Sequence, residues 1–168
     1  MAVVFTADEA EHIFSEYVFG FIAQDTARVI ARAYPPGQSE NVLCGIGLMT
    51  YTEFMGWFDR RLAGVPETRN ENRDSFNHFL GQMGPCYVAV LKSGFSVWKH
   101  FRNALVHEYA VREAIDIYLP ANQIACGIHR DPATKRYALW CGRYFTDFYA
   151  ACAASYLRHT GNQAPPMP

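Results

Sequence analysis

The sequence has no excess of basic charge, no long apolar run and no secretory leader. Its 15 Lys and Arg residues stand against 16 Asp and Glu residues, a formal net charge of -1. Because no overall positive field would gather nucleic acid, any site for a polyanion must be a local concentration of charge. Residues 1–10 lack the basic start and apolar run of a secretory signal, and no stretch approaches the length of a membrane span. We therefore expect a cytoplasmic protein without a membrane partner.

The chain also has little that would cross-link it or hold a metal. Its cysteines are odd in number, widely spaced and mostly set among apolar neighbours: Cys44, Cys86, Cys126, Cys141 and Cys152. No two of them stand at the spacing of zinc ligands, so we expect no metal site and no other cofactor. This pattern favours reduced, buried thiols over a framework of disulfides.

What the chain does have is enough apolar residues for a real core. It has 168 residues, of which 50% are hydrophobic. That is the size of one compact domain and leaves no room for a second. We expect a single domain over residues 1–161, followed by a proline-rich, flexible tail over residues 162–168.

Helical patterns fill the first two thirds of the chain. Thr6 and Glu9 have the spacing of a capping box, in which each side chain satisfies a free amide at a helix start. Apolar residues then recur at helical spacing until Pro35. The polar stretch 65–74 is expected to be a loop. Further runs with the helical period are 43–64, 76–83, 87–91 and 95–109.

The pattern changes near the C-terminus. Residues 115–119 look like a short strand, and alternating apolar residues predict a β-hairpin at about 123–142. A last helix is expected to begin at Thr146 or Asp147 and to end at Gly161. The sequence therefore predicts a mainly α protein, a helical bundle with a small antiparallel β-hairpin or three-stranded β element near its C-terminus.

Chemistry-bearing side chains are dense in the stretch 95–109. On an α-helix at about 100° per residue, its apolar side chains gather on one arc that could dock on a bundle. Tyr109 lies one heptad after Arg102 and shares its edge of the helix. The opposite, solvated side carries two cations, an amide and two imidazoles: Lys99, His100, Arg102, Asn103 and His107.

The stretch from Arg102 to Tyr109 resembles the signature of the HEPN superfamily. In the toxin branch of that family, the HepT-like toxins, an Arg and a His separated by four residues are followed by one residue and a Tyr. Arg102, His107 and Tyr109 have this spacing, and Asn103 follows the Arg. The motif covers about eight residues. The hairpin and the last helix are not part of the minimal four-helix core of the family.

This resemblance implies a metal-independent RNA endonuclease, in a toxin, phage-defence or stress system, that acts as a homodimer. The motif helices of two protomers would meet, so that two Arg102 and two His107 side chains face one cleft. Histidine, with an unperturbed pKa of about 6.5, suits proton transfer during attack by the 2′-hydroxyl. The planar fork of arginine matches phosphate oxygens. Asn103 would orient the imidazole or touch the phosphate. Lys99 and His100 belong to no family motif; they lie on the solvated face of the helix, and we expect them to contact the RNA.

The toxin branch also implies partners. A separate antitoxin is expected there, and in that branch a nucleotidyltransferase partner adds AMP to the matching Tyr. Tyr109 is therefore a conditional modification site.

Each motif residue also has a plainer interpretation. His107 could be a histidine at a helix C-terminus, stabilised by the helix dipole. Arg102 could pair with Glu108 or Glu113 on the surface, and Tyr109 could be a core or interface aromatic.

Two other classes of protein therefore stay open. One is a non-catalytic HEPN-like module whose polar face binds a nucleotide or a partner protein, and the other is an all-α interaction protein that matches the motif by accident. A buried Arg102 side chain would favour these two classes over the nuclease. The remaining histidines have no acidic or sulfur partner at ligand spacing and are expected to be structural: His12, His78, His129 and His159.

Overall fold

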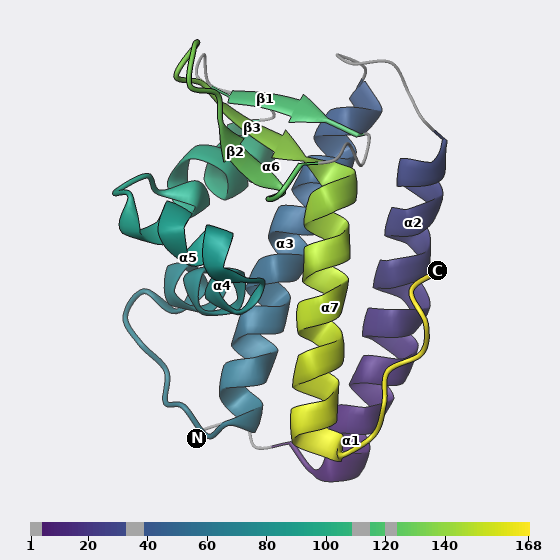
Figure 1. Ribbon diagram of the computed structural model, residues 1–168. Helices are drawn as coiled ribbons and strands as arrows, with labels where there is room; N and C mark the ends of the chain where they lie inside the picture. The colour runs from purple at the N-terminus through teal and green to yellow at the C-terminus, as the bar shows by residue number, and fades with distance from the viewer. Residues whose placement is uncertain (1–4, 33–38, 109–114, 120–123) are drawn as a thin grey trace.

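The structure is a computed structural model that describes residues 5–32, 39–108, 115–119 and 124–168. Within these ranges the protein is mainly helical, with a small three-stranded mixed sheet near the C-terminus (Figure 1), which confirms the predicted fold class. Two segments, named η, have the wider turns of a π-helix. The elements are α1 (Ala7–His12), η1 (Ile13–Ile22), α2 (Ala23–Ala31), α3 (Ser39–Leu62), α4 (Glu71–Gln82), α5 (Pro85–Lys92), η2 (Trp98–Asn103), α6 (Ala104–Glu108), β1 (Ile115–Tyr118), β2 (Ile128–Arg130), β3 (Tyr137–Trp140) and α7 (Cys141–Thr160).

The first three elements follow one another without a break and form one long helix. The predicted capping box at its start is confirmed. Thr6 Oγ1 accepts a hydrogen bond from the Glu9 amide at 3.2 Å, and Glu9 Oε2 accepts one from the Thr6 amide at 2.8 Å. Further along, the buried Phe14 ring lies 5.2 Å from the rings of both Phe58 and Tyr156. This N-terminal helix is therefore fixed against α3 and α7 by aromatic packing.

Helix α3 packs against α2, α4 and α7 and forms the centre of the bundle (Figure 1). It comes close to α4 at Gly56, where an added Cβ would overlap the backbone oxygen of Ser75. The two helices contribute fully buried rings to the core, among them Phe58, Phe76 and Phe79. Because α3 also contacts η2, α6 and β1, side chains along it can reach distant parts of the chain.

Helix α4 begins within the stretch 65–74 that was expected to be a loop. Glu71 Oε2 accepts a hydrogen bond from the Thr68 amide at 2.8 Å, and the Asp74 amide donates to the carbonyl of Asn70 at 2.9 Å. The expected loop was therefore too long, because the first turn of α4 carries polar, largely exposed side chains and shows no apolar period.

Helix α5 ends before the chemistry-bearing stretch 95–109 begins its own helix. Gly94 has a φ of 81°, a left-handed conformation that glycine adopts readily. Lys92 therefore belongs to a different helix from Arg102. The predicted helix over 95–109 is confirmed for η2 and α6, and Tyr109 lies outside the described residues.

The sheet has the strand order β1-β3-β2. The expected hairpin is confirmed, with shorter strands than predicted: β2 pairs antiparallel with β3, and Ile128 lies opposite Leu139. Strand β1 adds to the other side of β3 in parallel, so the sheet is mixed. Its inner face covers one end of α3, where Gly45 comes close to the side chains of Ile117 and Leu139.

The last helix begins earlier than expected, directly after β3. Trp140 is its N-cap, and Thr146 lies inside the helix with its hydroxyl donating to the carbonyl of Gly142 at 3.1 Å. The prediction of a start at Thr146 or Asp147 is therefore wrong. The predicted end is confirmed, because Gly161 closes the helix with a φ of 76°.

Two cysteines contradict the expectation of reduced thiols throughout. Cys86 of α5 and Cys126, just before β2, form a disulfide across a sequence separation of 40 residues. The neighbouring residues bring these two segments together, because the amide of Gly127 donates to the hydroxyl of Tyr87 at 3.0 Å. The other three cysteines are free and buried, as expected: Cys44, Cys141 and Cys152.

The tail lies along the N-terminal helix (Figure 1). Tyr149 donates its hydroxyl hydrogen to the carbonyl of Pro165 at 2.8 Å, and the expected flexibility of the tail stays a prediction. In the part of the chain that the structure describes, no helix combines the length and the apolar character needed to cross a lipid bilayer.

Candidate functional site

The chemistry-bearing stretch is held on the bundle by the carboxylate of Glu53 in α3. Arg102 Nε lies 2.7 Å from Glu53 Oε2, and Arg102 Nη2 donates to Oε1 at 2.9 Å. Trp98 adds a bond from its indole Nε1 to Oε2 at 3.3 Å. The two charged side chains are largely buried, with 12% of the Arg102 side chain and 14% of the Glu53 side chain exposed. The hydrogen bond from Nη2 and the close charge contact at Nε together hold the guanidinium against Glu53.

The remaining edge of the guanidinium faces the other motif residues. Arg102 Nη1 donates to Asn103 Oδ1 at 3.2 Å and lies 3.1 Å from His107 Nε2. Because arginine can only donate, the second contact requires His107 Nε2 to act as the acceptor, as in a neutral imidazole. The His107 side chain is exposed. The structure therefore brings Arg102, Asn103 and His107 together, with an imidazole at the surface that can take up a proton.

The position of Arg102 differs from the expected solvated face. Its ion pair is with Glu53, 49 residues earlier in the chain, and its side chain is mostly covered. The α-helical wheel misplaced it because η2 has wider turns than an α-helix. Of the two carboxylates expected as surface partners, Glu113 lies outside the described residues.

Lys99 and His100 do not join this group. Lys99 is exposed, and its side chain forms no hydrogen bond or ion pair with any described residue. The His100 ring stacks on Phe95 at a centroid distance of 4.7 Å, and its Nδ1 lies 2.8 Å from the carbonyl oxygen of Ser96. Tyr109, the expected modification site, lies outside the described residues.

Glu53 is the residue of this group that the motif did not reveal. One signal in the sequence could have found it, since Glu53 is the one charged residue in the apolar run from Val42 to Phe58. A carboxylate at such a position is rarely buried unless it is paired. Its partner, however, could be identified only from the fold.

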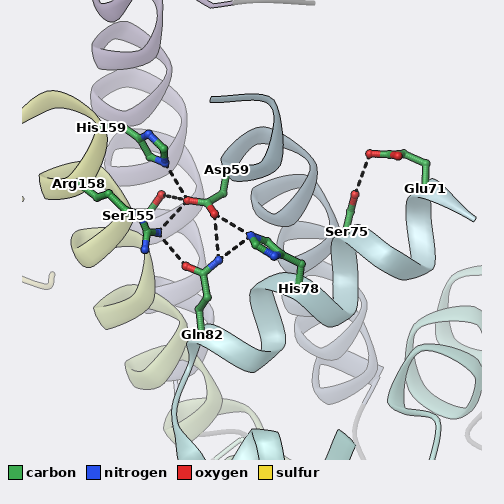
Figure 2. A network of polar contacts seen from close by, with 8 residues as sticks. All are labelled: Asp59, Glu71, Ser75, His78, Gln82, Ser155, Arg158 and His159. Carbon is green, nitrogen blue, oxygen red and sulfur yellow. Dashed lines mark hydrogen bonds and ion pairs between the residues drawn. The ribbon is translucent and has the colours of Figure 1, made fainter. Parts of the chain in front are cut away.

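A second polar group lies further along α3, around Asp59 (Figure 2). Asp59 Oδ2 is 2.8 Å from His78 Nε2 and 2.9 Å from Gln82 Nε2, both on α4. Asp59 Oδ1 accepts bonds from three residues of α7, which are Ser155, Arg158 and His159. We call these six residues the Asp59 clasp.

The Asp59 carboxylate is ionised and inaccessible, with 4% of its side chain exposed. Burial alone would raise the pKa of this carboxyl. Hydrogen bonds from His78, Ser155 and Gln82, together with the charge of Arg158, outweigh burial and hold the pKa well below its usual range. Because a solute cannot reach the carboxylate while the helices are packed, the clasp joins α3, α4 and α7 and is not itself a substrate site.

The clasp contains two of the histidines that were expected to be structural. His78 and His159 have no acidic partner at ligand spacing in the sequence, and both contact Asp59 in the fold. They lie 19 and 100 residues from it in the sequence, so no local spacing could show the group. His12 and His129 are exposed and lie apart from it. No group of three His, Cys, Asp or Glu residues that could hold a metal ion occurs within the described ranges.

Compared with known proteins, the chain matches no protein-family model, no curated protein and no solved structure. The functional argument therefore rests on the residues themselves.

Proposed function

We propose that this chain is a HEPN-type, metal-independent RNA endonuclease of a cytoplasmic toxin, phage-defence or stress system. The observation that carries the proposal is the contact between Arg102 Nη1 and His107 Nε2 at 3.1 Å. It joins a fixed cation and an accepting imidazole, which are the two groups that phosphodiester cleavage by the neighbouring hydroxyl needs.

In the proposed reaction His107 acts as the base. Its Nε2 removes the proton of the RNA 2′-hydroxyl, and the oxygen attacks the adjacent phosphorus. Once Nε2 is protonated it no longer accepts from Arg102 Nη1, which then donates to the phosphorane oxygens and stabilises their charge. The bond to the 5′-oxygen breaks as that oxygen receives a proton, leaving a 2′,3′-cyclic phosphate and a free 5′-hydroxyl. Asn103 guides Nη1 through its amide oxygen.

The proton for the leaving oxygen requires a second imidazole. One copy of the motif supplies one, so we propose a two-fold homodimer in which the η2 and α6 segments of two copies face one cleft. One His107 then acts as base and the other as acid. In a toxin system a separate antitoxin, or a nucleotidyltransferase that modifies Tyr109, would act on this surface.

The test is cleavage of RNA by purified protein in EDTA. We expect wild-type protein to leave 2′,3′-cyclic phosphate ends, His107→Ala to be inactive, and His129→Ala, which alters an exposed histidine on β2, to match wild type. Dimers that combine a wild-type and a His107→Ala protomer should also be inactive, because they keep only one of the two imidazoles that the shared cleft requires. A strict need for magnesium, or full activity of His107→Ala, would contradict the proposal.

One observation favours the second candidate, a non-catalytic HEPN-like module that binds a nucleotide or a partner protein. Arg102 is paired with Glu53 and only 12% of its side chain is exposed, which weakens its attraction for a phosphate. If every preparation binds RNA or nucleotide and none cleaves RNA, this candidate replaces the nuclease.

A further inference from the structure

Two adjoining cavities lie between α3, η2 and the start of α4. The first, of about 360 Å³, is lined by Trp98 and by residues 69–73. The second, of about 210 Å³, is lined by Glu53, Trp57 and Asn72 with their neighbours. Asn72 lines both, so the two cavities are neighbours, and we call them together the α4 groove.

The α4 groove borders the residues that hold Arg102. Trp98 lines the first cavity and Glu53 the second, and the two side chains are joined by the bond from the indole Nε1 to Oε2. Glu53 in turn holds the guanidinium of Arg102. An extended polymer bound in the groove would therefore pass the residues that fix the orientation of Arg102.

The charge at the groove mouth favours an anion. Arg69 is exposed, and its side chain forms no hydrogen bond or ion pair within the described part of the chain. Arg73 is also exposed, and its one ion pair there is a 3.5 Å contact with Asp74. Glu71 is the one carboxylate among the residues lining the first cavity, and it is already paired with the buried Arg60 and Arg61. Arg69 can therefore contact a phosphate directly, and Arg73 can do so by exchanging an exposed contact with Asp74 for a phosphate oxygen.

The groove also offers an aromatic wall. Trp98 is partly exposed, and its ring is held in one orientation by Glu53. Base stacking on such a ring tolerates any sequence, because every base has a π face. A duplex keeps its bases within its own stack, so a Trp wall selects for unpaired strands.

From these contacts we infer that the α4 groove binds unpaired RNA, with a base stacked on Trp98 and the flanking phosphates held by Arg69 and Arg73. The inference rests on the proposed action on RNA and assigns it a substrate class, single-stranded RNA, and a binding site outside the motif. The groove leads the strand to the Arg102 and His107 pair.

The experiment measures RNA binding separately from RNA cleavage. Binding is followed by fluorescence anisotropy in the His107→Ala background, with a labelled, unstructured RNA of about 12 nucleotides and the same strand annealed to its complement. We expect Arg69→Ala with Arg73→Ala to weaken binding of the single strand about tenfold. The double variant should also lower the slope of log affinity against log salt by about 1.4, because two phosphate contacts are lost.

Two sets of controls make the result specific. Arg28→Ala with Arg32→Ala removes the same charge from exposed positions at the other side of the bundle (Figure 1) and should leave affinity within about twofold. Trp98→Leu should weaken binding of the single strand about tenfold and leave the weaker duplex binding unchanged, whereas Trp98→Phe keeps a stacking ring and most of the affinity.

The outcomes separate this inference from the proposed nuclease. The groove inference is overturned if the Arg69→Ala, Arg73→Ala variant binds single-stranded RNA as tightly as the His107→Ala protein does. It is also overturned if that variant loses no more affinity than the control with Arg28→Ala and Arg32→Ala. Both results count even where wild-type protein cleaves RNA. If the groove variants lose affinity and no preparation cleaves RNA, the proposed RNA-binding groove is retained and the proposed nuclease activity is rejected. Equal binding of single strand and duplex, or tighter binding of a polyglutamate peptide than of RNA, would also overturn the inference.

Discussion

The Asp59 clasp predicts a large loss of stability when a single charge is removed. Asp59→Asn keeps the size of the side chain but replaces one accepting oxygen by a donating amide. In the native protein the carboxylate is contacted by five donor atoms from α4 and α7. In the variant the new amide nitrogen at position 59 faces donor groups of one neighbouring helix, and the partly buried His159 side chain loses its charged partner.

The size of the effect follows from the burial of the carboxylate. A hydrogen bond to a charged group contributes about 1.5–3 kcal/mol, and breaking a buried ion pair costs about 3–5 kcal/mol. His78 and Arg158 reach solvent, with 37% and 50% of their side chains exposed, so their ion pairs with Asp59 are screened and count for less. Because Asn keeps one oxygen, we expect a loss of about 3 kcal/mol in the free energy of unfolding.

The loss can be measured by urea unfolding followed by circular dichroism. With a dependence on urea of about 2 kcal/mol per molar, the midpoint should fall by about 1.5 M. Ser155→Ala removes one buried donor and leaves the charge, so it should cost about 1.5–2 kcal/mol, less than Asp59→Asn.

The effect should depend on pH in a definite direction. The Asp59 pKa is lower in the folded protein than the ordinary 3.8 of the unfolded chain. Its stabilising contribution is therefore complete above about pH 5 and declines as the pH falls below the unfolded value toward the folded one. The difference between wild type and Asp59→Asn should narrow by up to about 1.4 kcal/mol per pH unit below that point. A change under 1 kcal/mol at pH 7, or a difference that stays constant on acidification, would refute the reasoning.

Three further perturbations test other parts of the structure. Arg102→Ala should lower the free energy of unfolding by about 2–3 kcal/mol in urea titrations, since it leaves a mostly buried carboxylate unpaired. A change under 0.5 kcal/mol would mean that Arg102 is an exposed residue and not part of a buried ion pair. Gly56→Ala should cost about 2–3 kcal/mol because α3 must move from α4, whereas Gly81→Ala, whose Cβ meets one side-chain atom at 3.7 Å, should be neutral or stabilising in the same titration. Breaking the Cys86–Cys126 disulfide should cost about 4 kcal/mol on the chain-entropy estimate, and alkylation of the unreduced, unfolded chain should label three thiols and not five.

The sequence predicted the elements whose apolar residues have a clear period. The N-terminal helix, α3 and the hairpin all bury one face, and their patterns show it. The start of α4 was not predicted, because residues 71–74 are polar and partly or fully exposed. They are held in a helix by backbone and capping hydrogen bonds and carry no apolar stripe. The start of α7 escaped because Cys141 and Tyr144 are buried like strand residues, although the chain has already turned into a helix.

The site was predictable only as far as it is local. Arg102, Asn103 and His107 lie within two turns of one another, so their spacing indicated a group. Glu53 completes that group from another helix, as Asp59 gathers its partners from two helices. Such contacts depend on how α3 packs, which no spacing along the chain encodes.

The role of Glu53 decides between the two candidate functions. If Arg102 acts in catalysis, its ion pair with Glu53 holds Nη1 toward the reacting phosphate. The same pair lowers the net positive charge of the site. Glu53→Gln then frees the charge and loosens the orientation, so RNA should bind more tightly while single-turnover cleavage slows about tenfold or more. If the surface only binds, the same variant should bind RNA more tightly and no preparation should cleave. Glu16→Gln, which makes the same charge change at an exposed position on η1, should alter neither quantity by more than about twofold. Cleavage that rises in step with affinity in Glu53→Gln would mean that the carboxylate merely opposes RNA binding, and the positioning role would have to be abandoned.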